Sequence, residues 1–235
     1  CVGSLFGAPR EAPDSLGASA AFQTLCERAG VTLAVPDGIA GLCCGTPWRS
    51  KGLDEGYAVM ARRTFETVWR ASDEGRLPVV CEASSCGLGL REIGDHLDGD
   101  DARRYRSLRI LDAVSFVRTE LLDRLTVHRR LRSVAVHPTC ASEHLGSTDD
   151  LQAVAAACAE EVVVPTTWGC CGFAGDRGML RPEVTAAATA PQAAELAERT
   201  FDAYVSNNRT CELGMSRATG KTYQHVLELL ETLTR

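Results

Sequence analysis

Apolar and polar residues recur along the chain in patterns that predict alternating helices and strands. In the segment 53–72, apolar side chains recur every three or four residues, which is typical of an amphipathic helix. The short apolar run LPVVC at 77–81 is typical of a buried strand. The same reasoning predicts helices at 14–29, 53–72, 113–127, 150–159, 182–199 and 222–233, and strands at 31–35, 77–81, 107–111, 132–137, 161–165 and 203–207. Strands that alternate with helices favour an α/β fold with parallel sheets.

The cysteines form an unusual pattern within this alternation. The chain has 11 of them, and two adjacent pairs are each followed by glycine, at 43–45 and 170–172. Adjacent cysteines rarely form a disulfide with each other, and zinc sites usually space their cysteines by two to four residues. Adjacent thiolates can, however, reach two irons of one cluster. The glycine after each pair permits a positive φ, which lets backbone N–H groups turn toward the sulfurs.

Alignment on the two CCG tripeptides exposes an internal repeat. Each half has a single Cys, then CCG, then Cys-x-Leu-Gly. Each half therefore offers four thiols, the number that a [4Fe–4S] cluster takes. The predicted ligands are Cys1, Cys43, Cys44 and Cys86 in the first half and Cys140, Cys170, Cys171 and Cys211 in the second. We expect two pseudo-symmetric parallel α/β units, 1–130 and 131–235, each with one CCG motif at the carboxyl ends of its strands.

The remaining cysteines have simpler interpretations. Cys26 and Cys158 fall where helical patterns need an apolar residue, so we expect both in the core. Cys81 ends a predicted strand, and a core position is favoured over a role as a fifth ligand. The odd number of cysteines argues against a secreted disulfide framework.

Other polar residues near the motifs leave alternatives open. His137 in HPTC is either a loop residue bonded to the backbone or a partner of Cys140. Asp176 is expected to pair with a neighbouring Arg. Four cations near the motifs either offset the charge of a cluster or lie on the surface: Arg49, Lys51, Arg177 and Arg209. The other four histidines are expected at the surface: His96, His128, His144 and His225.

Composition excludes several classes of protein. The formal net charge is −6 and there is no basic tract, so nucleic-acid binding is not expected. No segment offers the roughly 20 apolar residues that a membrane-spanning helix needs. We therefore expect a cytoplasmic protein, either free or peripheral at the inner face of the membrane. Residue 1 is Cys and not Met, which indicates a piece of a longer product.

The cysteine motifs resemble a known family. The two CCG segments are similar to the cysteine-rich (CCG) domain of heterodisulfide reductases. The same domain occurs in the iron–sulfur subunits of glycolate oxidase, lactate utilisation and anaerobic glycerol-3-phosphate dehydrogenase systems. The segments 137–140, 169–179 and 206–223 also resemble the C-terminal region of large, iron–sulfur-containing FAD-linked D-lactate dehydrogenases. The family pattern ends each half in CxxC, but Gly89 and Gly214 replace the second Cys here.

The resemblance implies a function. It points to an iron–sulfur electron-transfer domain, with one or two [4Fe–4S] clusters, of a flavin-linked 2-hydroxy-acid dehydrogenase of the D-lactate or glycolate type. An upstream FAD-binding domain or subunit would supply electrons, and a quinone or cytochrome would accept them. No flavin or dinucleotide fingerprint is visible in the sequence, so the chain alone is not expected to oxidise a hydroxy acid. A thiol–disulfide oxidoreductase of the heterodisulfide reductase kind and a zinc-binding structural module are the alternatives.

Overall fold

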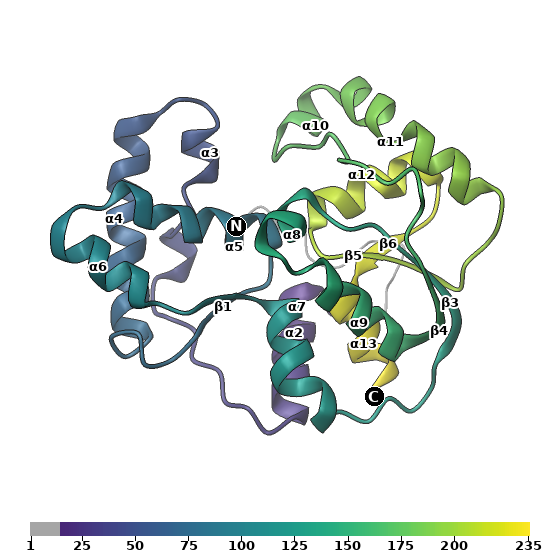
Figure 1. Cartoon of the computed structure of the whole chain (residues 1–235), viewed down its shortest axis with the longest axis horizontal. Coiled ribbons are helices and arrows are strands. Elements are labelled where there is room, and N and C mark those ends of the chain that lie inside the picture. Colours follow the sequence, from purple (N-terminus) through teal and green to yellow (C-terminus); the bar gives the residue numbers. More distant parts are fainter. Residues whose placement is uncertain (1–14) are drawn as a thin grey trace.

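The computed structural model describes residues 15–235, and Figure 1 shows that they form two lobes. Elements of the first half are α2 (Ala18–Arg28), α3 (Thr46–Arg49), α4 (Asp54–Ala71), β1 (Val79–Cys81), α5 (Ser84–Glu92), α6 (Gly99–Ser107), β2 (Ile110–Asp112) and α7 (Ala113–Phe116). Those of the second half are β3 (Leu131–Val136), α8 (Cys140–Leu145), α9 (Thr148–Cys158), β4 (Ala159–Val163), α10 (Arg177–Leu180), α11 (Pro182–Ala197), β5 (Ala203–Ser206), α12 (Arg209–Thr219), β6 (Tyr223–His225) and α13 (Val226–Leu233).

Every strand pair in the described chain is parallel. The first half contributes a two-stranded sheet, β1–β2, and the second half a four-stranded sheet in the order β4-β3-β5-β6. The prediction of parallel α/β layers is therefore confirmed. The sheets differ in size, and the predicted pseudo-symmetry between two units stays a prediction.

Helices cover both faces of the four-stranded sheet (Figure 1). Val134 and Val136 of β3 point into a core with α9 and α13, while the intervening Ala135 packs with residues of α11 and α12 on the opposite face. This alternation follows from the two-residue period of a strand. Both faces of this sheet are buried. Polar and sulfur-bearing residues therefore lie mainly in the loops at the strand ends.

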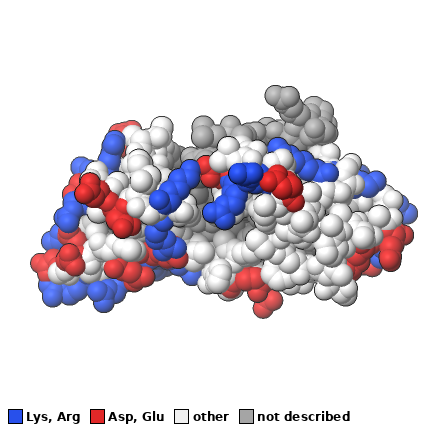
Figure 2. Space-filling view, turned by 90° about the horizontal axis from the view of Figure 1, so that it is seen from above, with Lys and Arg blue, Asp and Glu red and all other residues white. Residues whose placement is uncertain are grey.

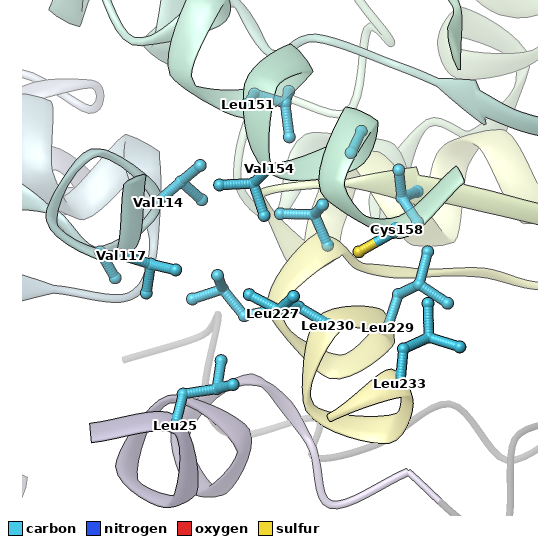
Figure 3. Close-up of a cluster of buried hydrophobic side chains, with 14 of the residues drawn as sticks. Leu25, Val114, Val117, Leu151, Val154, Cys158, Leu227, Leu229, Leu230 and Leu233 are labelled. Atoms are coloured by element: carbon cyan, nitrogen blue, oxygen red, sulfur yellow. The ribbon is translucent and has the colours of Figure 1, made fainter. Parts of the chain in front are cut away.

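The main hydrophobic core joins the two halves of the sequence. Figure 3 shows Leu25 of α2 and Val117 after α7 pointing toward Val154 of α9 and Leu227 and Leu230 of α13. All five side chains are fully buried. Cys26 and Cys158 lie in this core, as predicted. The division at residues 130 and 131 stays a prediction, but helices from both sides of it share one core.

The first lobe has a smaller core of its own. Tyr57 and Phe65 of α4 pack there with Ile93, with Tyr105 of α6 and with Ile110 of β2. This core holds α4 and α6 together and supports the short sheet from one side.

Some predicted elements differ from the structure. Residues 31–35 form no strand: Val31 and Leu33 pack against the core, but Val35 is 63% exposed. The helix predicted at 113–127 is a short α-helix followed by a π-turn and a 3₁₀ turn that ends at Arg124. The region 222–233 begins with strand β6, because Tyr223 pairs with Tyr204 of β5, and only then becomes helical. Helices α5, α6, α8 and α12 were not predicted.

No helix within residues 15–235 combines the length and the apolar character that crossing a bilayer requires.

Candidate metal centre

The second-half cysteines lie at the carboxyl ends of neighbouring strands. Cys140 begins α8 directly after β3, and the side chain of Thr139 caps that helix by accepting from the Ser142 backbone N–H. Cys211 lies in the first turn of α12, after β5. Because β3 and β5 are parallel neighbours, their ends bring both helix starts to the same edge of the sheet.

The CCG loop completes a continuous group of four thiols. The Sγ atoms of Cys171 and Cys211 are 3.1 Å apart, and both residues are buried. Side-chain hydrogen bonds link Cys170 to Cys171 and to Cys140. Cys170 is the exposed member of this group and Cys140 is half-buried. The structure thus brings together all four second-half cysteines that the repeat singled out.

The glycine after each cysteine pair adopts the conformation expected of it. Gly172 has a φ of +67°, and its backbone N–H donates to Cys170 Sγ at 3.4 Å. Gly45 has a φ of +87°, and its backbone likewise hydrogen-bonds to Cys43. A side chain at either position would be strained in this left-handed region. These turns direct N–H groups toward the sulfurs.

The first half also brings four described thiols together, and three of them belong to the predicted set. Hydrogen bonds link Cys43 to Cys44, Cys44 to Cys86, and Cys86 to Cys81. Cys81 ends β1 and joins the sulfur group rather than a purely apolar core. Cys1, predicted as a ligand of this site, lies outside the described residues.

His137 lies beside the buried pair of the second site. The ligand atoms of His137, Cys171 and Cys211 all lie within 4.8 Å of one another, and a side-chain hydrogen bond links His137 to Cys171. The Nδ1 atom is 2.9 Å from Oε1 of Gln192, on α11. His137 is thus a loop residue whose backbone N–H donates to the carbonyl of Val205, as one alternative predicted, and its ring contacts Gln192 and Cys171. Sequence reasoning missed Gln192, because its helix carries other polar residues, such as Thr189 and Glu195, and nothing in the sequence distinguishes it from them.

Burial and contacts between thiols raise the pKa of several cysteines in the two sites. The hydrogen bond to Cys171, and then burial, raise the pKa of Cys170 to about 12. Burial, followed by the contact with Cys170, raises the pKa of Cys140 to about 11. The hydrogen bond from Cys43 to Cys44 raises the pKa of Cys43 well above its ordinary value. A thiol is a weak nucleophile until it loses its proton, so these groups need a cation to become effective donors.

Gly89 and Gly214 let each Cys-x-Leu-Gly helix pack directly against its CCG pair. A Cβ at position 89 would lie 2.2 Å from Thr46 Oγ1 and 3.1 Å from Cys44 Sγ. A Cβ at position 214 would lie 3.2 Å from a Thr185 methyl group and 3.6 Å from Cys171 Cβ. A larger residue has little room at either position.

Polar contacts tie the two sites together across the lobes. Ser84 and Thr139, which precede the helix turns bearing Cys86 and Cys140, have their hydroxyl oxygens 3.0 Å apart. Lys51 of the first half pairs with Asp176 of the second at 2.7 Å, and this pairing lowers the pKa of Asp176. The predicted partner of Asp176, a neighbouring Arg, was therefore wrong. Figure 2 shows Lys and Arg side chains gathered along the seam between the lobes.

Two residues for which the sequence predicted or allowed a surface position are buried. The Arg209 side chain is 6% exposed and pairs with Glu212 and Glu228, which are also buried. His225 is 2% exposed and caps α13 by accepting from the Leu227 backbone N–H. The predicted surface position of His225 was wrong, and the surface alternative for Arg209 does not hold, because both side chains find partners inside the protein. His96, His128 and His144 are exposed and Arg49 pairs with Glu92.

The donor set fits a thiolate-bound metal centre. Four thiols in each half are the soft ligands that iron–sulfur clusters and zinc prefer. Among the described residues, the buried Nε2 atom of His137 has no nitrogen or oxygen partner. Polar atoms buried in this way usually have a partner, and a metal ion bound beside Cys171 would supply one for Nε2.

Comparison with known proteins agrees with this geometry. Residues 134–216 match the family model described as "Cysteine-rich domain", which spans Cys140, Cys170, Cys171 and Cys211. The chain is 25% identical over 220 residues to the glycolate oxidase iron–sulfur subunit of Escherichia coli (strain K12), an alignment that covers 91% of this chain. The chain spans about half of that relative, 53% of its length. Residues 134–216 thus match the cysteine-rich domain model, and the chain is similar over most of its length to the iron–sulfur subunit of glycolate oxidase.

Proposed function

We propose that the chain is an iron–sulfur electron-transfer module of a flavin-linked 2-hydroxy-acid dehydrogenase. The observation that carries the proposal is the convergence of Cys140, Cys170, Cys171 and Cys211 into one linked group of thiols. The similarity to an iron–sulfur subunit supports the same assignment. The second site would hold a [4Fe–4S] cluster through these four residues.

The first site would hold a second cluster. Cys43, Cys44 and Cys86 are its described members from the repeat, and Cys81 adds a thiol beside Cys86. Cys1 is the further ligand that we propose for this site.

The partners of the module follow from the same proposal. A flavin-binding domain or subunit would reduce the clusters, and a quinone or cytochrome would reoxidise them. The cofactors would perform the redox chemistry, while the protein would set distance, burial and potential. The compartment we propose is the cytoplasm, with a peripheral position at the membrane as the alternative.

Direct thiol–disulfide chemistry has less support. It requires a thiolate at neutral pH, whereas the pKa values of Cys140 and Cys170 are raised to about 11 and about 12. A bound metal removes this obstacle, because metal binding displaces the thiol protons.

Reconstitution tests the proposal. The chain is incubated anaerobically with ferrous iron and sulfide, desalted, and assayed for iron, acid-labile sulfide and the paramagnetic resonance signal of the reduced cluster. Cys171→Ala and Cys211→Ala should lose the second-site cluster. Cys158→Ala is the matched control, since this fully buried cysteine lies in the hydrophobic core and should leave the iron content unchanged.

The outcomes separate the alternatives. A protein that takes up no iron or sulfide, but binds zinc in stoichiometric amount, would identify a zinc module instead. Unchanged iron in both Cys171→Ala and Cys211→Ala would show that these thiols are not ligands.

A further inference from the structure

We propose that His137 would be a nitrogen ligand of the second-site metal centre, through its Nε2 atom. This inference rests on the proposed iron–sulfur function and adds a fifth donor to the four thiols.

The position of His137 is fixed by the backbone on both sides. Its N–H donates to the carbonyl of Val205 in β5 at 2.8 Å, and its own carbonyl accepts from Ser206 Oγ at 2.7 Å. The residue is 1% exposed. The backbone of His137 is therefore fixed at the junction between β3 and β5, and its side chain is enclosed by the protein.

The ring is also oriented from α11. Nδ1 lies 2.9 Å from Oε1 of Gln192, which is itself 2% exposed. A carbonyl oxygen only accepts hydrogen bonds, so Nδ1 carries the proton and Nε2 keeps its lone pair. Metal-bound histidines are held in this way, with the second ring nitrogen donating to an oxygen that fixes the tautomer.

The His137 ring lies beside the thiols of Cys171 and Cys211. Within residues 15–235, Nε2 has no nitrogen or oxygen partner. His137, Cys171 and Cys211 have their ligand atoms within 4.8 Å of one another, and a side-chain hydrogen bond joins His137 to Cys171. A buried imidazole beside two thiols is suited to a metal ion between them.

A fifth donor is relevant to one difference between this sequence and the family pattern. Gly214 replaces the second cysteine of the CxxC pattern, and a Cβ there would lie 3.2 Å from Thr185 and 3.6 Å from Cys171 Cβ. The helix that bears Cys211 therefore offers one thiol and not two. His137 restores the number of donors to five from a different strand end.

Nitrogen hyperfine spectroscopy tests the inference directly. The protein is produced with ¹⁵N-histidine, loaded with iron and sulfide, and reduced, and the cluster signal is examined for coupling to nitrogen. We expect a strong ¹⁵N coupling that is lost in His137→Ala, while iron and sulfide contents remain unchanged because the four thiols are intact. His144→Ala is the matched control, since His144 is exposed on the short helix that begins with Cys140, and it should keep the coupling.

Two Gln192 variants extend the test without removing the ring. Gln192→Leu should weaken the coupling because Nδ1 loses its acceptor, and Gln192→Glu should restore it. Their effects remain measurable if His137→Ala does not fold. A loaded wild-type protein that gives a cluster signal without strong nitrogen coupling would overturn the ligand assignment and leave the proposed function standing. A protein that forms no cluster at all would overturn the proposed function, and the inference with it.

Discussion

Alanine substitutions at Gly89 and Gly214 should have unequal effects, although the two glycines occupy equivalent places in the repeat. Each lies inside a helix, where replacement of Gly by Ala adds about 1 kcal/mol of stability when nothing else changes. The new methyl group meets different surroundings at the two positions. At 89 it lies 2.2 Å from Thr46 Oγ1 and 3.1 Å from Cys44 Sγ, whereas its nearest neighbour at 214 is 3.2 Å away.

These distances decide the sign of each effect. A contact of 2.2 Å cannot exist, so Thr46 and the start of α3 must move, and such overpacking costs about 1–3 kcal/mol. Gly89→Ala should therefore lower the free energy of unfolding by up to ~2 kcal/mol after the helical gain is counted. Gly214→Ala needs a shift of a few tenths of an ångström and should stay within ~1 kcal/mol of wild type.

Urea denaturation and iron analysis measure both effects. Gly89→Ala should also retain less iron, because the Cys44 thiol is displaced with its loop. The double variant Gly89→Ala, Thr46→Ala removes the closest contact, and it should recover stability beyond the sum of the two single changes. If Gly89→Ala is as stable as Gly214→Ala and binds as much iron, the close packing of α5 on the CCG loop is wrong.

Three further results are expected. Leu230→Ala should lower the free energy of unfolding by about 2–5 kcal/mol, because this fully buried side chain joins α13 to α2 and α9, and a loss under 1 kcal/mol in denaturant titrations would contradict that core. Burial, and then the charge of Arg209, lowers the pKa of His225 from 6.5 to about 3. Between these two pH values the unfolded state therefore binds a proton at this residue and the folded state does not. Stability should fall by up to ~1.4 kcal/mol per pH unit as the pH drops from about 6.5 toward about 3, and His225→Asn should lose this dependence in unfolding curves measured across that range. Lys51→Met should change thermal stability by less than ~1 kcal/mol, because its ion pair with Asp176 is half-exposed, and a larger loss would show that the pair anchors the lobes.

Apolar periodicity was enough to predict most of the parallel strands. Runs such as RSVAVH and AYVSN are apolar at nearly every position, as expected of strands buried on both faces. Val31, Leu33 and Val35 alternate equally well but gain no strand partner, and pairing is not encoded in a short local pattern. The strand β6 was missed for the opposite reason, since its three residues merge into the helical pattern that follows.

The site was predictable where it depends on topology and not where it depends on side-chain direction. The repeat placed Cys140 and Cys211 after strands, and parallel strands bring such positions together. The sequence does not tell which way His137 points, because its ring is oriented by Gln192 on α11, far along the chain. Nor does it tell that the Cys81 thiol turns toward Cys86. Arg209 shows the same limit: its carboxylate partner Glu228 lies on α13, 19 residues away.

The two sites are held in one rigid frame by contacts that the repeat does not reveal. Leu25 of the first half and Leu230 of the second share the main core, and Ser84 meets Thr139 between the helix starts that bear Cys86 and Cys140. Close packing transmits displacement, so a cluster lost from one site should disturb the other through this contact. The two sites nevertheless differ in chemistry. The imidazole of His137 lies beside the thiols of the second site. In the first site, the further group is a thiol, that of Cys81. Because a neutral nitrogen donor adds no negative charge to a cluster whereas a thiolate adds one, the second site should have the higher reduction potential, and electrons should pass from the first site to the second.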